Sequence, residues 1–269
     1  MCELLGISSN APIETRDVLR AFRQRGGGTA DNRDGWGIAF RAGGGFRLLK
    51  EPVPAVHSAG FGALCESLRS DLIVAHVRKA RHPPISTLVN THPFEHVCCG
   101  REWVFAHNGL VPEIVEAQRS SRDPVCRPAG ETDSEHAFCR VLAAVAEHFS
   151  AAAPVSGSSW FDAVAAASEL VASHGKFNFL MSDGEYLIAY GHDRLHHVQR
   201  RAPAAPGTLA AEVVIIATEP LTADEGWQPF EPGELRIYRF GRLTERIKTT
   251  PPLAQQDAER SRAGVVSIG

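Results

Sequence analysis

The sequence has no strong excess of either charge and no long apolar run. Lys and Arg nearly balance Asp and Glu over the 269 residues, which leaves a formal net charge of -3. A near-neutral chain does not favour a polyanionic partner such as nucleic acid, and the basic residues lack the interleaved aromatics of a single-strand binding groove. No apolar run approaches the roughly 20 residues of a membrane helix. We therefore expect no nucleic-acid partner and no membrane segment.

The chain also lacks a secretory signal and a disulfide framework. The first ten residues, MCELLGISSN, contain neither a basic segment nor a long apolar one. The six cysteines, at positions 2, 65, 98, 99, 126 and 139, do not follow the spacing of a disulfide scaffold. We expect a cytoplasmic protein whose thiols are reduced.

No internal repeat and no clear linker divides the chain. Apolar periodicity predicts helices at 13–24, 131–148 and 161–173, the first ending at Gly26-Gly27-Gly28. Strands are predicted at 2–8, 35–40, 46–50, 72–77, 103–106, 177–181, 186–190, 195–199, 213–217 and 235–240. This order favours an α+β domain with helices packed on antiparallel sheets. Residues 249–269 are polar with little periodicity, so we expect a poorly ordered tail.

Cys2 is the first residue that suggests chemistry. A methionine before a small residue is removable, and its loss would leave a thiol and a free α-amine on one residue. The amine can then act as the base for the thiol. Reference pKa values of roughly 8.5 and roughly 7.7–8.0 make that proton transfer cost only about 1 kcal/mol. Taken alone, the position of Cys2 favours a buried strand residue.

Further segments follow Cys2 in a fixed order and change this interpretation. They are Arg25-Gly26-Gly27-Gly28, Asp34-Gly35-Trp36-Gly37, Ala75-His76-Val77-Arg78, Asn90-Thr91-His92-Pro93-Phe94, Ala106-His107-Asn108-Gly109, Gly130-Glu131-Thr132-Asp133-Ser134-Glu135 and Ala217-Thr218-Glu219-Pro220-Leu221, with Trp227 behind the last. With the opening Met1-Cys2-Glu3-Leu4-Leu5-Gly6, the set resembles the glutaminase domain of class II glutamine amidotransferases, which are N-terminal nucleophile (Ntn) hydrolases. Within that family it is most similar to the stand-alone YafJ-type members. The likeness runs from residue 2 to about residue 240.

The resemblance implies a fold and a reaction. The fold is the Ntn-hydrolase four-layer αββα sandwich with two antiparallel sheets, formed by one domain over residues 2–248 with Cys2 at the start of a central strand. The reaction is attack of the Cys2 thiolate on the side-chain amide of glutamine or another γ-glutamyl compound. Ammonia or an amine leaves, and water hydrolyses the thioester. The resemblance implies no cofactor.

The resemblance also assigns roles to site residues. The side-chain amide of Asn108 and the backbone N–H of Gly109 would form the oxyanion hole, where glycine permits a close backbone approach and an unusual φ. Arg78 would bind the substrate α-carboxylate with its planar guanidinium, and Asp133 would bind the α-ammonium group. Substrate contacts are also expected from His92, His107 and Trp36.

Each of these residues has an ordinary structural alternative. Asn-Gly is a strong hairpin-turn signal, Arg78 suits a surface position just past a strand, and an acid such as Asp133 is favoured at a helix N-terminus. Read one at a time, Arg78 and Asp133 favour these structural roles. The order of the segments together with Cys2 favours the catalytic interpretation.

The loop after Arg78 departs from the family pattern. Arg81 stands where many members have a small hydroxyl residue that helps to hold the substrate. A larger γ-glutamyl compound therefore fits the loop as well as free glutamine does. Residues 79–90 are predicted to form a mobile cover over the site.

Four other interpretations concern metals, partners and a loss of catalysis. His92, His96, Cys98, Cys99 and His107 are potential zinc ligands, but no paired ligand motif repeats and adjacent cysteines on a strand point to opposite faces, so no metal site is expected. The length leaves no room for a synthetase domain, so ammonia transfer would need a separate synthetase subunit. A homodimer stays open, as does a binding module that has lost catalysis, which would leave the oxyanion and head-group residues unexplained.

Overall fold

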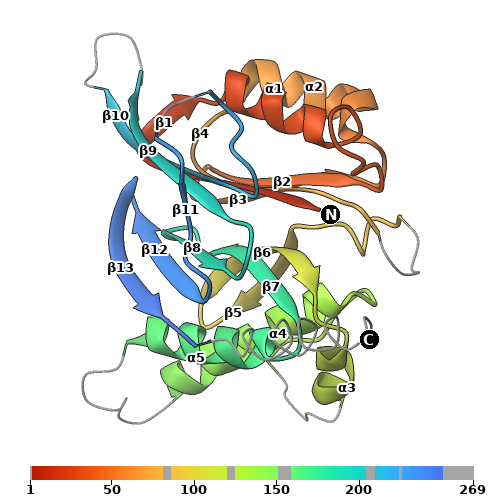
Figure 1. Ribbon diagram of the computed structural model, residues 1–269, viewed down its shortest axis with the longest axis vertical. Helices are drawn as coiled ribbons and strands as arrows, with labels where there is room; N and C mark the ends of the chain where they lie inside the picture. Colours follow the sequence, from red (N-terminus) through yellow and green to blue (C-terminus); the bar gives the residue numbers. More distant parts are fainter. Residues whose placement is uncertain are drawn as a thin grey trace, which may run out of the picture.

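The structure is built from two antiparallel sheets stacked between two layers of helices (Figure 1). The computed structural model describes residues 2–80, 86–119, 125–150, 159–203, 210–223 and 226–250. Helices α1 and α2 cover the outer face of one sheet, and α4 and α5 cover the outer face of the other. The expected αββα order of layers is therefore present.

The first sheet has seven strands in the order β11-β9-β10-β1-β4-β2-β3. Its strands are β1 (Glu3–Glu14), β2 (Trp36–Ala42), β3 (Gly45–Glu51), β4 (Arg69–Val77), β9 (His196–Ala202), β10 (Ala211–Ala217) and β11 (Gln228–Pro229). Helices α1 (Arg16–Arg25) and α2 (Ala59–Ser67) and the 3-10 turn η1 (Ala55–His57) lie on this sheet. Strand β1 is central, because β10 and β4 pair with its two edges.

The second sheet has six strands in the order β13-β12-β8-β7-β6-β5. Its strands are β5 (Phe94–Cys98), β6 (Arg101–Leu110), β7 (Lys176–Ser182), β8 (Tyr186–Gly191), β12 (Glu234–Arg239) and β13 (Arg242–Lys248). The helices on this side are α3 (Glu113–Arg119), α4 (Asp133–Ser150) and α5 (Trp160–Ala172).

Apolar side chains fill three layers, one between the sheets and one under each pair of helices. Neighbouring residues of β1 show how one strand serves two layers, because successive side chains of a strand point to opposite faces. Leu4 packs between the sheets, whereas Leu5 packs under α1 and α2. Burial on both faces explains why the central strands appear in the sequence as continuous apolar runs.

Most predicted elements are confirmed, but the first helix begins later than its periodicity indicates. Ile13 and Glu14 still belong to β1, where they pair with Ser70 and Arg69 of β4, and α1 starts at Arg16. Pairing with β4 therefore overrides the local helical pattern. The glycines after α1 do end it, with Gly27 at φ +109. The sequence analysis did not predict α2, α3, β5, β11 or β13.

The expectation that all thiols are reduced is wrong for one pair. Cys126 and Cys139 form a disulfide, with their Cα atoms 5.0 Å apart. Cys139 lies on α4 and Cys126 lies before that helix, so only the path of the intervening chain brings the two sulfurs together. Cysteine spacing alone does not reveal such a pair, because connectivity depends on the fold.

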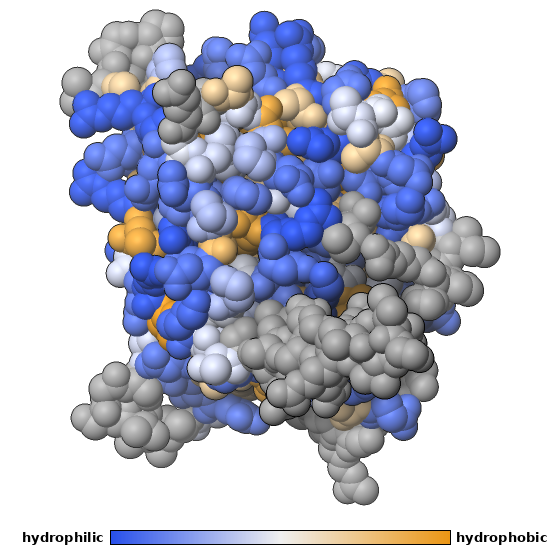
Figure 2. All heavy atoms as spheres, viewed as in Figure 1, coloured by the Kyte–Doolittle hydropathy of each residue, from blue (hydrophilic) through white to orange (hydrophobic). Residues whose placement is uncertain are grey.

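The predicted tail begins with a residue that is packed. Thr249 is buried, and its hydroxyl donates to the carbonyl oxygen of Gly233 at 2.9 Å. Residues 251–269, which make up the rest of that predicted tail, lie outside the described residues. Among the helices that the structure describes, none is long and apolar enough to cross a membrane. On the face seen in Figure 2, the coloured surface is mostly hydrophilic and apolar residues show as small separate spots.

Candidate active site

Cys2 directly precedes β1, the central strand of the first sheet. Strand β1 starts at Glu3, whose partner in β4 is Val77, and β10 ends at Ala217 beside Leu5. The thiol therefore lies where the last residues of β4 and β10 leave the sheet. The residues that follow these two strands, Arg78-Lys79 and Thr218-Glu219, therefore lie near Cys2.

The backbone of Lys79 holds the Cys2 thiol. The N–H of Lys79 donates to Cys2 Sγ at 3.2 Å, and the Lys79 carbonyl oxygen lies 3.4 Å from the same sulfur, where it accepts from the thiol. Burial raises the pKa of the Cys2 thiol, and the Lys79 N–H and the charge of Arg78 oppose that shift. The protonated thiol is thus the favoured resting form, and the Lys79 N–H, which favours the thiolate, is already in contact with the sulfur.

Arg78 is buried, with 5% of its surface exposed, and lies directly after β4. Its N–H donates to the Gly35 carbonyl oxygen at 2.8 Å, so the backbone at Arg78 is fixed against the start of β2. The guanidinium charge acts on the Cys2 thiol and on His76. The alternative of an arginine on the surface is therefore wrong. Arg81, from the same loop, lies outside the described residues.

Asn108 reaches Cys2 from the second sheet. Its Nδ2 donates to the Cys2 carbonyl oxygen at 2.5 Å and to Thr218 Oγ1 at 3.3 Å. The Asn108 carbonyl oxygen accepts from Asn178 Nδ2 at 3.0 Å across the β6–β7 pair. The His-Asn-Gly segment therefore lies within β6, and the hairpin-turn alternative is wrong.

Gly109 is required by a close backbone approach. A Cβ atom placed on it would lie 1.8 Å from the Lys176 carbonyl oxygen and 2.5 Å from His107 Nε2. The residue does not adopt a left-handed φ, unlike the glycines of the turns, so the unusual φ expected for it is not found. Any side chain at this position would displace β7 from β6.

Asp133 is the first residue of α4, and its carboxylate binds the end of β6. Asp133 Oδ2 accepts from the Val111 N–H at 2.7 Å. The hydroxyl of Ser134 lies 2.8 Å from His107 Nδ1, and His107 Nε2 lies 3.2 Å from the Lys176 carbonyl oxygen. A carbonyl only accepts, so Nε2 carries the proton and Nδ1 accepts from Ser134. Burial lowers the pKa of His107, and the negative charge of Asp133 opposes that shift. The ring is therefore neutral.

Two further buried histidines pack side by side between β4 and β5. The ring centroids of His76 and His92 are 4.2 Å apart, and the His92 ring also packs on Phe94 at 4.4 Å. Burial lowers the pKa of His76 to about 3 and that of His92 well below its ordinary value, and the nearby charge of Arg78 adds to both shifts. Both rings are therefore neutral at pH 7.

The structure does not bring Trp36 to the thiol. Its indole packs on Phe61 at a centroid distance of 4.9 Å, in the apolar layer under α1 and α2. That layer is on the face of the first sheet opposite to the sheet that supplies Asn108. Substrate binding by Trp36 and by His92 stays a prediction.

Comparison with known proteins decides the family. The family model described as class II glutamine amidotransferases matches residues 1–263. The chain belongs to this family. The YafJ protein of Escherichia coli (strain K12) is 38% identical over 258 residues, which cover 90% of this chain and 98% of that protein. The resemblance inferred from the motifs is confirmed.

Solved structures agree with this assignment. A crystal structure from Pseudomonas aeruginosa, described as a predicted glutamine amidotransferase, superposes with a TM-score of 0.66 at 34% identity and covers 91% of this chain and 100% of that one. Glutamine phosphoribosylpyrophosphate amidotransferase from Bacillus subtilis gives a TM-score of 0.64 at 14% identity, covering 92% of this chain and 49% of that one, and so supports the fold alone. The amidotransferase has the expected Ntn-hydrolase αββα sandwich.

A more distant relative is named for a γ-glutamyl compound. The γ-glutamyl-hercynylcysteine sulfoxide hydrolase of Mycobacterium tuberculosis (strain H37Rv) is 28% identical over 196 residues. The match covers 73% of this chain and 71% of that protein.

One group of side chains in this amidotransferase has the composition of a metal site. The ligand atoms of His96, Cys126 and Cys139 all lie within 4.8 Å of one another. The two sulfurs are bonded to each other, so in this state they are not thiolate ligands. Of the potential zinc ligands found in the sequence, His96 alone belongs to this group, and its Nε2 lies 3.7 Å from Glu135 Oε1.

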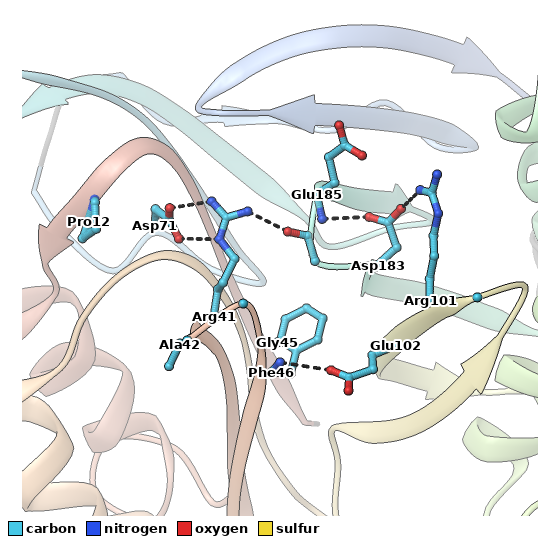
Figure 3. Close-up of a pocket in the computed structure, with 14 residues that line it drawn as sticks. Pro12, Arg41, Ala42, Gly45, Phe46, Asp71, Arg101, Glu102, Asp183 and Glu185 are labelled. Carbon is cyan, nitrogen blue, oxygen red and sulfur yellow. Dashed lines mark hydrogen bonds and ion pairs between the residues drawn. The ribbon is translucent and has the colours of Figure 1, made fainter.

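A polar pocket of about 980 Å³ lies at the other end of β1 from Cys2 (Figure 3). Asp71 lines it and lies six residues before Val77, the β4 partner of Glu3, so at about 3.3 Å per residue the pocket is roughly 20 Å from the Cys2 end of β1. Its two arginines pair within it: Arg41 with Asp71 and with the Gly184 carbonyl oxygen, and Arg101 with Asp183. This pocket is separate from the active site of the amidotransferase.

The sequence analysis gave no role to two contributors to the candidate site around Cys2. Thr218 has no exposed surface, and its hydroxyl accepts from the Leu4 N–H at 2.9 Å as well as from Asn108. The other is the Lys79 peptide, which acts through backbone atoms and so has no side-chain signature. A hydroxyl residue directly after the apolar run 213–217 was the available signal for Thr218.

Proposed function

We propose that this protein hydrolyses a γ-glutamyl amide through a thioester on Cys2, releasing ammonia or an amine. The observation that supports this most directly is the meeting of Cys2 and Asn108 from different sheets. Asn108 Nδ2 lies 2.5 Å from the Cys2 carbonyl oxygen, and Gly109 follows it without a side chain. The side-chain amide of Asn108 thereby lies beside the proposed nucleophile, where acyl transfer requires a donor.

The first step needs the α-amine of Cys2, which removal of Met1 makes available. The amine takes the thiol proton, and the thiolate attacks the γ-carbonyl carbon of the substrate. The buried Cys2 thiol resists this ionisation, and the Lys79 N–H at 3.2 Å favours it. Attack turns the carbonyl oxygen into an oxyanion, which Asn108 Nδ2 and the Gly109 N–H stabilise.

The second step breaks the carbon–nitrogen bond. The leaving nitrogen takes the proton from the α-ammonium group of Cys2 and departs as ammonia or an amine, which leaves a thioester on Cys2. The free amine then accepts a proton from water as the water attacks the thioester. Glutamate is released and the thiol is restored, so protons and bonds balance over the cycle.

The substrate head group is bound by two side chains of opposite charge. The guanidinium of Arg78 binds the α-carboxylate, and the carboxylate of Asp133 binds the α-ammonium group. Asn108 and Val111, three residues apart on and after β6, contact Cys2 and Asp133 respectively. This short stretch fixes the distance between the head-group site and the nucleophile.

These contacts bind the γ-glutamyl part of a substrate. They do not select the amine that departs. The relative named as a γ-glutamyl-hercynylcysteine sulfoxide hydrolase gives a reason to test larger γ-glutamyl amides beside free glutamine. Glutamine is the first substrate to test, because the family is named for it.

The test is intact mass before and after exposure to the glutamine analogue diazo-oxo-norleucine. We expect loss of Met1 and one adduct, located on Cys2 by peptide mapping and absent from a Cys2→Ala variant that keeps Cys65, Cys98 and Cys99. Retention of Met1, or an adduct on another cysteine, would refute the proposed mechanism. Loss of Met1 without an adduct would exclude free glutamine as substrate and direct the assay to larger γ-glutamyl amides.

Ammonia release by the isolated protein then separates hydrolysis from a role as a subunit. Full turnover of glutamine without a partner supports a free-standing hydrolase. A stoichiometric synthetase recovered with the tagged protein, together with slow turnover alone, would support delivery of ammonia to that partner.

A further inference from the structure

Asp34, a carboxylate that the proposed reaction does not use, binds the backbone of the segment that contacts the Cys2 thiol. It lies in the loop between α1 and β2, and its Oδ2 accepts from the Ala80 N–H at 2.7 Å. The Asp34 N–H donates to the Arg78 carbonyl oxygen at 3.0 Å, and the Arg78 N–H donates to the Gly35 carbonyl oxygen at 2.8 Å. Three hydrogen bonds thus hold residues 78–80 against residues 34–35.

Lys79 is the middle residue of this segment, and its peptide groups face the sulfur. Its N–H lies 3.2 Å from Cys2 Sγ and favours the thiolate, whereas its carbonyl oxygen, 3.4 Å away, accepts from the protonated thiol. The balance between thiol and thiolate therefore depends on how this backbone is oriented. The bonds from residues 34–35 to Arg78 and Ala80, on each side of Lys79, fix that orientation.

The local conformation around Asp34 is tightly defined. Gly35 has φ +143, and a Cβ atom on it would lie 3.1 Å from Thr91 Oγ1, so the turn that carries Asp34 is packed against its neighbours. Asp34 is half-buried, and its second oxygen lies 3.5 Å from Ser86 Oγ. A charged acceptor at 2.7 Å from a backbone N–H makes a strong bond, since ionised partners strengthen hydrogen bonds.

We infer that Asp34 is a positioning residue for the nucleophile, which aims the Lys79 N–H at Cys2 Sγ through its bond to Ala80. The inference rests on the proposed function, in which Cys2 is the nucleophile. The backbone of Arg78 is held separately, by the Asp34 N–H and the Gly35 carbonyl oxygen, and these bonds do not involve the Asp34 side chain. The side chain of Asp34 itself does not touch the reacting atoms.

The chain offers a matched control on the same segment. Asp31 forms an ion pair with the side-chain ammonium of Lys79, and both side chains are well exposed. An Asp31→Asn substitution removes a carboxylate three residues from Asp34 but leaves the Lys79 backbone bonds in place. We expect it to change neither the thiol titration nor turnover.

The experiment measures alkylation of Cys2 by iodoacetamide over a range of pH, in protein that has lost Met1. Peptide mass spectrometry follows Cys2 and, in the same sample, the exposed Cys99 as an internal reference. In Asp34→Ala we expect the Cys2 profile to move to higher pH and its rate at neutral pH to fall roughly 5-fold, the effect of losing one aligned donor. Asp34→Asn keeps a neutral acceptor, so we expect partial rescue. Cys99 is expected to be unchanged.

Steady-state kinetics with glutamine provide the second readout. Asp34→Ala should lower kcat by a factor similar to the loss of alkylation rate and leave KM close to wild type, because the backbone bonds that hold Arg78 are kept. A fall in kcat with an unchanged Cys2 pH profile would show a merely structural role and overturn the inference.

The outcomes separate this inference from the proposed function. If wild-type Cys2 takes the diazo-oxo-norleucine adduct but every folded Asp34 variant keeps the wild-type alkylation profile, the positioning role is wrong and the proposed function stands. If wild-type Cys2 takes no adduct from any γ-glutamyl analogue, the proposed function itself fails. Should Asp34→Ala not fold, as judged by circular dichroism, Asp34→Asn with its weaker bond to Ala80 supplies the test.

Discussion

Replacing Thr218 by valine should weaken both the fold and the catalytic site, although the two side chains have nearly the same shape. The Thr218 hydroxyl has two partners, the Leu4 N–H at 2.9 Å and Asn108 Nδ2 at 3.3 Å. Valine removes this acceptor at a position with no exposed surface. Water cannot replace it easily, so the Leu4 N–H is left buried and unpaired.

The magnitude follows from the cost of an unsatisfied buried donor. Leaving one such group unpaired costs about 1–3 kcal/mol of the free energy of unfolding. The matched control is Thr218→Ser, which keeps the hydroxyl and loses one methyl group, at a cost of about 1 kcal/mol. We also expect kcat to fall roughly 10-fold or more in the valine variant, because Asn108 loses one of the two groups that orient its amide.

The assay is urea unfolding of the three proteins, followed by glutamine turnover at saturating substrate. The transition slopes should agree, so that midpoints report stability alone. The Thr218→Val variant should have the lowest stability and the lowest kcat, and the Thr218→Ser variant should be close to wild type. Equal midpoints and equal kcat for the valine and serine variants would refute the reasoning, because the two differ chiefly in the hydroxyl.

Three further predictions test the site and the fold. Asn108→Ala should lower kcat for ammonia release by about 100- to 1,000-fold, the usual effect of losing one oxyanion donor; an unchanged kcat would remove Asn108 from that role. Burial lowers the pKa of His76 to about 3 from an ordinary 6.5, so between these pH values the unfolded chain binds a proton that the folded chain excludes. The free energy of unfolding should therefore fall as pH drops from 6.5 towards 3, by about 1.4 kcal/mol per pH unit for each such histidine. Urea unfolding at several pH values measures this slope, and a His76→Asn variant with the wild-type slope would contradict it. Reducing the Cys126–Cys139 disulfide, which joins residues 13 apart, should lower stability by about 3 kcal/mol; thermal unfolding with and without dithiothreitol checks this, and an unchanged melting temperature after reduction confirmed by mass would contradict it.

The proposed active site contains groups from both sheets, and each sheet supplies a different kind of group. The first sheet carries Cys2 and the Arg78-Lys79 segment at the ends of β1 and β4. The second carries Asn108 within β6 and, through Val111, the contact to Asp133. The packing of the two sheets therefore sets the geometry between Cys2 and Asn108, the proposed nucleophile and the proposed oxyanion donor.

Much of this site could be predicted from the sequence, because the residues with distinctive chemistry occur in short segments of fixed order. Cys2, Arg78, Asn108 and Asp133 were all found from such segments. Trp36 was included on the same basis, but the structure packs its side chain on Phe61 beneath α2. The motif did not show where the Trp36 side chain packs, and its contact with substrate stays a prediction.

Secondary structure predicted from the local sequence was wrong where strand pairing with a distant segment determined the conformation. Residues 13 and 14 fit a helical periodicity, yet they extend β1 because β4 offers Ser70 and Arg69 as partners. The Asn-Gly of residues 108 and 109 signals a turn, yet it lies within β6 because β7 pairs with it. In both cases the strand partner outweighs the local preference.

The sequence by itself determined the family, the kinds of layers and the chemical groups available, because apolar periodicity and residue type are local properties. The tertiary structure alone decided that Cys126 bonds to Cys139, that the Lys79 peptide faces the thiol, and that Thr218 supports Asn108. The contacts of Cys2 with Lys79 and with Asn108 span 77 and 106 residues, and that of Leu4 with Thr218 spans 214. Contacts over such separations depend on how whole sheets pair and pack, which no short segment of sequence specifies.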